Sequence, residues 1–202
     1  MKIYGAHGLF LHASSVLVEG GALLFLGHST AGKSTISKLL EKTNPILADD
    51  SVFASRNKHG FWQVADGRFY FEDGDICCCE AAVRRRSADG SSFRLLGCMR
   101  IHKAGHVKVT SLAPFETARY LIDAVMEVDV QRKFGRLDDK IGEIKTSVSL
   151  VRQLRRHWFY LAADIARSCP GWHLWFSKNL YFSDLHNAIS AVSAQAREMH
   201  EN

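Results

Sequence analysis

The 202-residue chain has no apolar run that approaches the roughly 20 residues needed for a membrane-spanning helix. The apolar stretch near its start is interrupted by His7 and His12 and leads directly into further strand-like sequence. This pattern indicates strands rather than a secretion signal. We therefore expect a cytoplasmic protein with no membrane partner.

The five cysteines lack C-x-x-C spacing, and three of them, Cys77–Cys79, are adjacent. Adjacent residues on a strand point to opposite faces, so these three thiols cannot converge on one metal ion. In a chain without a secretion signal, this pattern favours reduced thiols over a disulfide framework or a structural metal site.

The chain also lacks a concentrated basic region, although its net charge is +5. The only basic clusters are Arg84–Arg86 and the group Arg152, Arg155 and Arg156. A solvated face explains such clusters as well as a binding patch does, so nucleic acid is not an expected partner. The content of 47% hydrophobic and 23% charged residues is ordinary for a globular protein, and the length suits a single domain over residues 1–202.

What the chain does contain is one strong motif, which matches the G-x-x-x-x-G-K-[ST] pattern of a Walker A phosphate-binding loop. The motif and its next residue are Gly27-His28-Ser29-Thr30-Ala31-Gly32-Lys33-Ser34-Thr35. An apolar run at 22–26 precedes it and predicts a strand buried on both faces. The apolar spacing after it predicts a helix from about Lys33 to the region of Lys42 to Pro45.

Each part of this loop has an expected task in binding ATP. Backbone N–H groups and the positive end of the helix dipole should face the phosphates. Gly27 and Gly32 should allow backbone conformations and close approaches that other residues do not. Lys33 should reach the β- and γ-phosphates, and Ser34 should ligate Mg²⁺.

The remaining pattern is rich in short strands and ends in helices, which predicts a mixed α/β (α+β) fold without repeats or linkers. Strands are predicted at 9–11, 14–18, 45–48, 52–54, 61–64, 68–71, 76–79, 94–101 and 172–176, with a hairpin or meander at the start. One helix is predicted from Pro114, a second from Thr146 to Ile165, and a third from a cap at Asp184 towards His200. The apolar stripe of the first consists of Phe115, Ala118, Leu121, Ile122, Val125 and Met126.

Asp49 and Asp50 follow the strand beyond the predicted loop helix. The sequence places them at the carboxyl end of a strand neighbouring the loop strand, which is where ligands bind in open α/β sheets. Adjacent carboxylates on an extended chain point apart, so one can serve Mg²⁺ and the other the acceptor hydroxyl. His12 lies on the strand before the loop strand and is a candidate to line the site.

Together these stretches resemble the catalytic domain of the HPr kinase/phosphorylase family, whose wider relatives include small HPr-kinase-like serine kinases and phosphoenolpyruvate carboxykinases. The family has a histidine before a G-V-L-V strand, a G-D-S-G-x-G-K-S loop and a V-A-D-D segment. The matching stretches are His12–Val18, Gly27–Ser34 and Ile46–Asp50. The resemblance implies a P-loop fold of the HPr kinase/carboxykinase type, with mixed sheets, a P-loop helix and C-terminal helices.

By this resemblance Asp49, Asp50, Lys33 and His12 carry catalysis, and Ser34 and Asp50 are linked to the metal. His28 departs from the family, which has an aspartate there, and its role stays open. The family's glycine-rich V-R-G-L-G segment is also absent. The third metal-linked acid is therefore Asp66, Glu72 or neither.

These features predict an ATP- and Mg²⁺-dependent kinase that phosphorylates a hydroxyl, with a serine of a peptide or small protein as the expected acceptor. A kinase for a small metabolite would use the same site, and a nucleotide-binding regulatory protein with little catalysis is the alternative from another class. The chain lacks the N-K-x-D motif of a GTPase. The acceptor, the reverse phosphorolysis and assembly into a homo-oligomer stay open.

Overall fold

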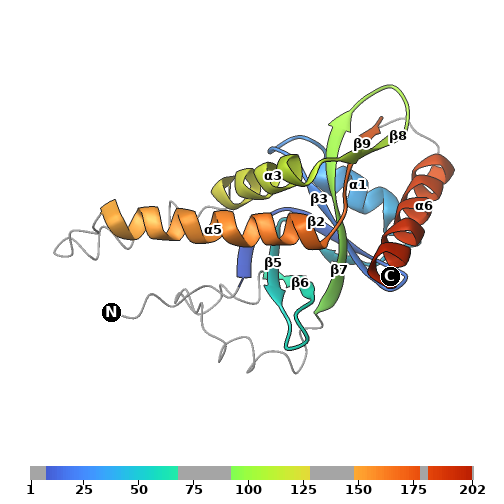
Figure 1. Cartoon of the computed structure of the whole chain (residues 1–202). Coiled ribbons are helices and arrows are strands. Elements are labelled where there is room, and N and C mark those ends of the chain that lie inside the picture. Colours follow the sequence, from blue (N-terminus) through green and yellow to red (C-terminus); the bar gives the residue numbers. More distant parts are fainter. Residues whose placement is uncertain (1–7, 68–91, 128–147, 178–181, 202) are drawn as a thin grey trace.

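A computed structural model describes residues 8–67, 92–127, 148–177 and 182–201 (Figure 1). These residues form a mixed α/β fold of nine strands and four helices. The strands are β1 (Gly8–His12), β2 (Ser14–Val18), β3 (Gly21–Leu26), β4 (Ile46–Ala48), β5 (Ser51–Arg56), β6 (Trp62–Asp66), β7 (Phe93–Lys103), β8 (Lys108–Leu112) and β9 (Gly171–Phe176). The helices are α1 (Lys33–Leu40), α3 (Pro114–Glu127), α5 (Val148–Ser168) and α6 (Phe182–Glu201).

Several predicted features lie outside the described residues. They are the strands at 68–71 and 76–79, the cysteines 77–79, Glu72 and the arginines 84–86. Within the described ranges, no helix is long and apolar enough to cross a membrane.

β3 is the central strand for the candidate site, because it leads into the loop 27–32 that carries the Walker A motif. It pairs with β7 in parallel and with β2 in antiparallel orientation. Gly20, with φ at 86°, makes the tight turn between β2 and β3, so the predicted hairpin is confirmed for this pair. β1 does not extend that hairpin into a meander: it pairs with β5 instead.

The chain from 8 to 18 runs beside the chain from 46 to 56 and is interrupted once. His12 pairs with Ser51 before the break, and Ser15 pairs with Ala48 beyond it. The acid pair 49–50 lies at this break, where the Ala13 N–H donates to the Asp50 carbonyl over 3.3 Å. The sequence predicted β4 to be a direct neighbour of β3. This is wrong, because β2 lies between them. Since both pair antiparallel with β2, their carboxyl ends still meet at one edge.

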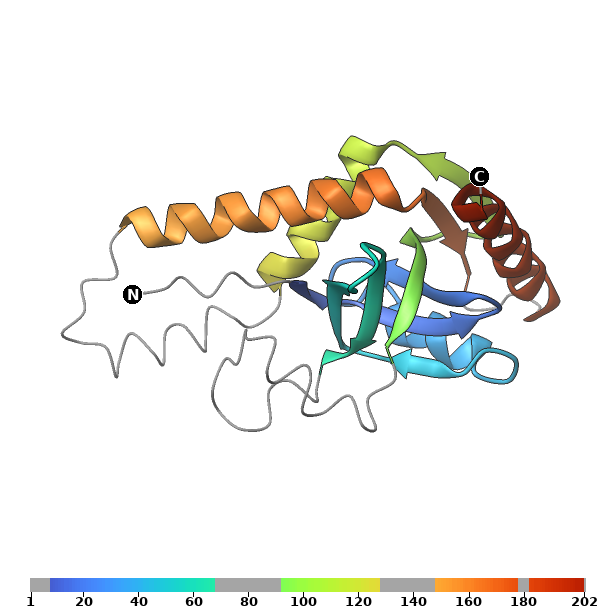
Figure 2. The ribbon, with the colours of Figure 1, turned by 60° about the horizontal axis from the view of Figure 1, so that its bottom comes forward.

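Helices cover both faces of the central strands (Figure 1). α3 and α5 pack with Ala22, Leu24 and Leu26 of β3, whereas α1 and α6 pack with Leu23 and Phe25. Residues 22–26 are all fully buried, which confirms the predicted two-sided strand. Figure 2 shows α5 crossing α3 and reaching beyond the strands.

Some element boundaries differ from the prediction for local reasons. α1 ends at Leu40 because the N–H groups of Thr43 and Asn44 both bond the Leu40 carbonyl and turn the chain. Asp184 lies within the first turn of α6, which begins at Phe182, and does not precede it as a cap. β8 was not predicted, because its sequence KVTSL lacks a clear apolar alternation and only its last residue is buried.

The predicted apolar stripe of α3 also needs correction at both ends. Phe115 is 74% exposed and Met126 is 39% exposed, so neither belongs to the buried face. The middle of the stripe is confirmed, since Ala118, Leu121 and Val125 are buried, and Thr117 and Ala124 belong to the same buried face. α3 thereby packs on β1 and α5 and ends above the start of the phosphate-binding loop.

Candidate phosphate-binding site and acid pair

The loop 27–32 has the backbone shape that its glycines predict. Gly32 has φ at 106°, and Thr30 has φ at 69°, an uncommon value for a non-glycine residue. A Cβ on Gly32 would lie 2.8 Å from Cζ of Phe176. Gly27 is needed for close packing rather than for positive φ, since a Cβ there would lie 2.8 Å from Cβ of Ala31.

α1 begins directly after this loop, as predicted. Its N-cap is Gly32, which offers no side chain to the N–H groups of the first turn, and that turn holds no acidic residue. These N–H groups and the positive end of the helix dipole are therefore left for another anion. An open helix N-terminus behind a tight loop is suited to bind phosphate.

Lys33, the first residue of α1, folds back onto the loop. Its Nζ donates to the Gly27 carbonyl over 2.7 Å and to the His28 carbonyl over 3.2 Å, and only 6% of the residue is exposed. Burial lowers the pKa of Lys33, an effect that the negative charges of Glu127 and Asp50 oppose. The ammonium group therefore lies beside the loop with carbonyl oxygens as its only partners among the described residues.

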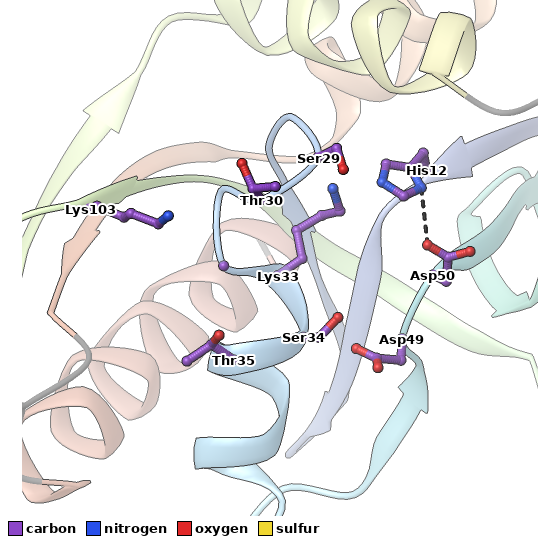
Figure 3. A pocket seen from close by; sticks show the side chains of 10 residues that line it. His12, Ser29, Thr30, Lys33, Ser34, Thr35, Asp49, Asp50 and Lys103 are labelled. Atoms are coloured by element: carbon purple, nitrogen blue, oxygen red, sulfur yellow. Dashed lines mark ion pairs between the residues drawn. The ribbon is translucent and has the colours of Figure 1, made fainter.

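A pocket of about 390 Å³ opens at this edge of the sheet (Figure 3). It is lined by His12, Ser29, Thr30, Gly32, Lys33, Ser34, Thr35, Asp49, Asp50 and Lys103. Six of the nine predicted loop residues, the acid pair and His12 thus line one cavity. Gly27, His28 and Ala31 shape the loop but do not line the pocket, and Lys103, from the end of β7, is an addition that the sequence did not indicate.

The two carboxylates of the acid pair point in different directions, as expected for adjacent residues (Figure 3). Asp50 is exposed and its Oδ1 lies 3.1 Å from Nδ1 of His12. Asp49 turns towards the side of Ser34, and its buried Oδ1 has no hydrogen-bond partner among the described residues. A buried carboxylate oxygen without a donor is costly unless a ligand or a cation satisfies it.

Glu127, the last residue of α3, is a site residue that the sequence analysis missed. Its Oε1 lies 2.7 Å from Nδ1 of His28, and its Oε2 lies 3.9 Å from Nε2 of His12. The sequence feature that could have identified Glu127 is its position three residues after the buried Ala124, which places it beside the buried face of an amphipathic helix. A charged residue at such a position needs a partner.

Glu127 is an acid close to the site through its contacts with His12 and His28, but, like Asp66, it does not line the pocket. Asp66 is 6% exposed, lies on β6 opposite Val52 and does not line the pocket. Among the described residues, no three His, Cys, Asp or Glu side chains form a group that could hold a metal ion by themselves.

No protein-family model matches the chain, and a search of curated proteins finds no match.

Proposed function

We propose that the protein is an ATP-dependent kinase that transfers the γ-phosphoryl group to a hydroxyl, with a serine of a peptide or small protein as acceptor. The observation that carries this proposal is the shared pocket: a loop of phosphate-binding sequence and the carboxylates of Asp49 and Asp50 line one cavity. Phosphoryl transfer needs both, because the phosphates must be held and the acceptor must be oriented or deprotonated. The sequence resemblance to the HPr kinase/phosphorylase family supports the same reaction and a P-loop fold.

Mg²⁺ fits the donor groups of this pocket. The unpartnered Oδ1 of Asp49 and the hydroxyl of Ser34 are hard oxygen ligands, which Mg²⁺ prefers, and the ion commonly takes only one or two protein groups beside phosphate oxygens. The resemblance linked Asp50 to the metal, whereas the side-chain directions favour Asp49 (Figure 3). When bound with ATP, Mg²⁺ would neutralise charge on the phosphates.

Asp50 and His12 fit the acceptor side of the reaction. The two side chains are paired over 3.1 Å, and Asp50 remains open to solvent where a hydroxyl could approach. A carboxylate there can accept the hydroxyl proton as the new P–O bond forms, while His12 holds it in place. Lys33 would stabilise the charge that develops on the transferred group.

A second cavity of about 230 Å³ suits the nucleoside part of ATP. It shares Gly32, Thr35 and Lys103 with the first pocket and adds Ala104, Phe176 and Ser177. The carboxylates occur only in the first pocket and the aromatic wall only in the second. ATP would therefore lie with its γ-phosphate towards Asp50 and its base towards Phe176.

The test is phosphotransfer from γ-labelled ATP to a lysate of the source cells, combined with ATP binding by calorimetry. We expect labelled protein with the unmodified chain. Asp50→Asn should lower turnover by about 10²-fold or more while ATP binding persists, because general-base assistance is typically worth that much. Asp184→Asn, an exposed aspartate on α6, is the matched control and should leave both unchanged.

Other results lead to different functions. A labelled small molecule instead of protein would replace the peptide acceptor with a metabolite. No transfer despite tight ATP binding would contradict the kinase and favour a nucleotide-binding regulatory protein. Equal loss of binding and turnover in Asp50→Asn would show that the acid pair is structural.

A further inference from the structure

Four polar and aromatic side chains of two adjacent strands lie together under α3, and none of them lines the P-loop pocket. Arg100 of β7 is the register partner of His173 of β9, and His102 is the partner of Trp175. His102 Nε2 lies 2.9 Å from His173 Nδ1, and the His102 ring stacks on Trp175. Tyr120 of α3 contacts both Arg100 and His173. We call the four strand residues the β7–β9 cluster.

Arg100 is the unusual member of this cluster, because it is buried and has no counterion in the part of the chain that the structure describes. The residue is 9% exposed, and its Nε is buried without a hydrogen bond. Among the described residues no carboxylate lies within ion-pair distance, and its contact is the Tyr120 ring at 4.5 Å. A guanidinium cannot lose its charge, and a cation–π contact of about 0.5–2 kcal/mol does not replace an ion pair for a buried cation.

The charged neighbours add to this positive charge. The guanidinium of Arg119 also lies over the Tyr120 ring, 4.8 Å from its centroid. The ammonium of Lys108 lies 5.5 Å from the centroid of the Trp175 ring. Arg100 also lowers the pKa of Lys33, so the guanidinium acts on the ammonium of the P-loop lysine. The cluster therefore has an excess of positive charge close to the P-loop.

The two histidines provide uncharged hydrogen-bonding groups beside Arg100. Burial is the main cause that lowers the pKa of both His102 and His173, and Arg100 lowers both further. The His102 pKa is also lowered by His173, whereas Glu116 raises that of His173. Near neutral pH this pair can donate and accept hydrogen bonds without a charge of its own.

We propose that the β7–β9 cluster binds a carboxylate of the phosphoryl acceptor, held by the guanidinium of Arg100. The orphaned Nε and a neighbouring Nη form the planar edge that binds a carboxylate through two parallel hydrogen bonds. Arg100 is the register partner of Leu26, the last residue of β3 before the loop that leads to Lys33, so one acceptor molecule can meet both the cluster and the transferred phosphoryl group. The identity of this carboxylate as part of the acceptor rests on the proposed kinase function.

The site can be tested without the acceptor by titrating acetate into the protein and following backbone and indole N–H signals by NMR. We expect acetate to shift the signals of the β7–β9 cluster, including the indole of Trp175. Arg100→Gln should weaken this binding roughly 10- to 100-fold, since hydrogen bonds to charged groups contribute about 1.5–3 kcal/mol. Arg119→Gln is the matched control, because Arg119 contacts the same Tyr120 ring but is exposed, and should bind acetate normally.

Arg100→Lys keeps the charge without the planar fork and should also weaken binding, which covers the case that the glutamine variant does not fold. Acetate shifts that avoid the cluster in the unmodified protein, or that persist in both Arg100 variants, would overturn the proposal. A stronger response of the cluster to inorganic phosphate than to acetate would overturn the carboxylate assignment. Titrating ATP in the same experiment distinguishes the two proposals. If ATP shifts no signals of residues 27–35, the kinase function alone is contradicted. If acetate shifts no signals of the β7–β9 cluster, the carboxylate site alone is contradicted.

Discussion

The proposed function requires Lys33 to change partners when a nucleotide binds. In this structure its ammonium group donates to two carbonyls of its own loop. Phosphate oxygens offer stronger, charge-assisted hydrogen bonds to the same group. Burial lowers the pKa of Lys33. The negative charge of a phosphate beside it would oppose this effect and favour the charged ammonium.

We therefore predict that Lys33→Ala weakens ATP binding by roughly 10- to 100-fold and abolishes phosphotransfer, because one charge-assisted contact contributes about 1.5–3 kcal/mol. Isothermal titration calorimetry measures the affinity. Lys38→Ala, an exposed lysine on the same helix, is the control and should bind ATP as the unmodified protein does. An unchanged affinity in Lys33→Ala would refute the P-loop role.

If the loop binds a nucleotide as proposed, Glu127 would compete with it for the positive groups of the loop. It pairs with His28 over 2.7 Å and raises the pKa of Lys33. We predict that Glu127→Gln tightens ATP binding roughly five-fold, because a negative charge beside the phosphates costs about 1 kcal/mol. Glu116→Gln, near the other end of α3, is the control. His28→Asn should alter affinity less in the Glu127→Gln background, and weaker binding in Glu127→Gln would instead indicate a metal ligand.

At the scale of elements, the sequence predicts those parts that depend on local pattern. The buried run 22–26 and the glycines of the loop specify a strand and a tight turn, and both are found. The pairing of β1 with β5 depends on residues about 40 positions apart, and no local pattern encodes it. β8 also depends on a distant partner, because it forms by pairing with the edge of β9.

The candidate site divides in the same way. The loop residues follow one another in sequence, and Asp49 is followed directly by Asp50, so sequence motifs identify both groups. The pocket brings the two groups together. Glu127 reaches His28 across 99 positions, and Arg100 is identified only by its burial without a counterion. These two residues depend on how α3 crosses the sheet, which no spacing rule predicts.

At the scale of the whole molecule, three histidines on two parts of the fold link stability to pH. Burial lowers the pKa of His102 and His173 in the β7–β9 cluster and of His200 on α6, all from 6.5. The folded state therefore binds fewer protons than the unfolded chain once the pH falls towards 6.5. By linkage, the free energy of unfolding is highest above this pH and decreases as the pH falls through the lowered pKa values.

We predict that the midpoint of urea unfolding changes little between pH 8 and pH 7 and falls below about pH 6.5, with the histidines as one cause among the titrating groups. His102→Gln keeps a polar side chain on β7 but removes one titrating group, so its midpoint should fall less steeply between pH 6.5 and pH 5. His59→Gln, in the exposed turn after β5, is the matched control and should retain the full slope. If His102→Gln and the unmodified protein lose stability in parallel over this range, His102 is protonated equally in the folded and unfolded chains. The loss of stability would then come from carboxylates, whose unfolded pKa values near 4 place their main effect at lower pH.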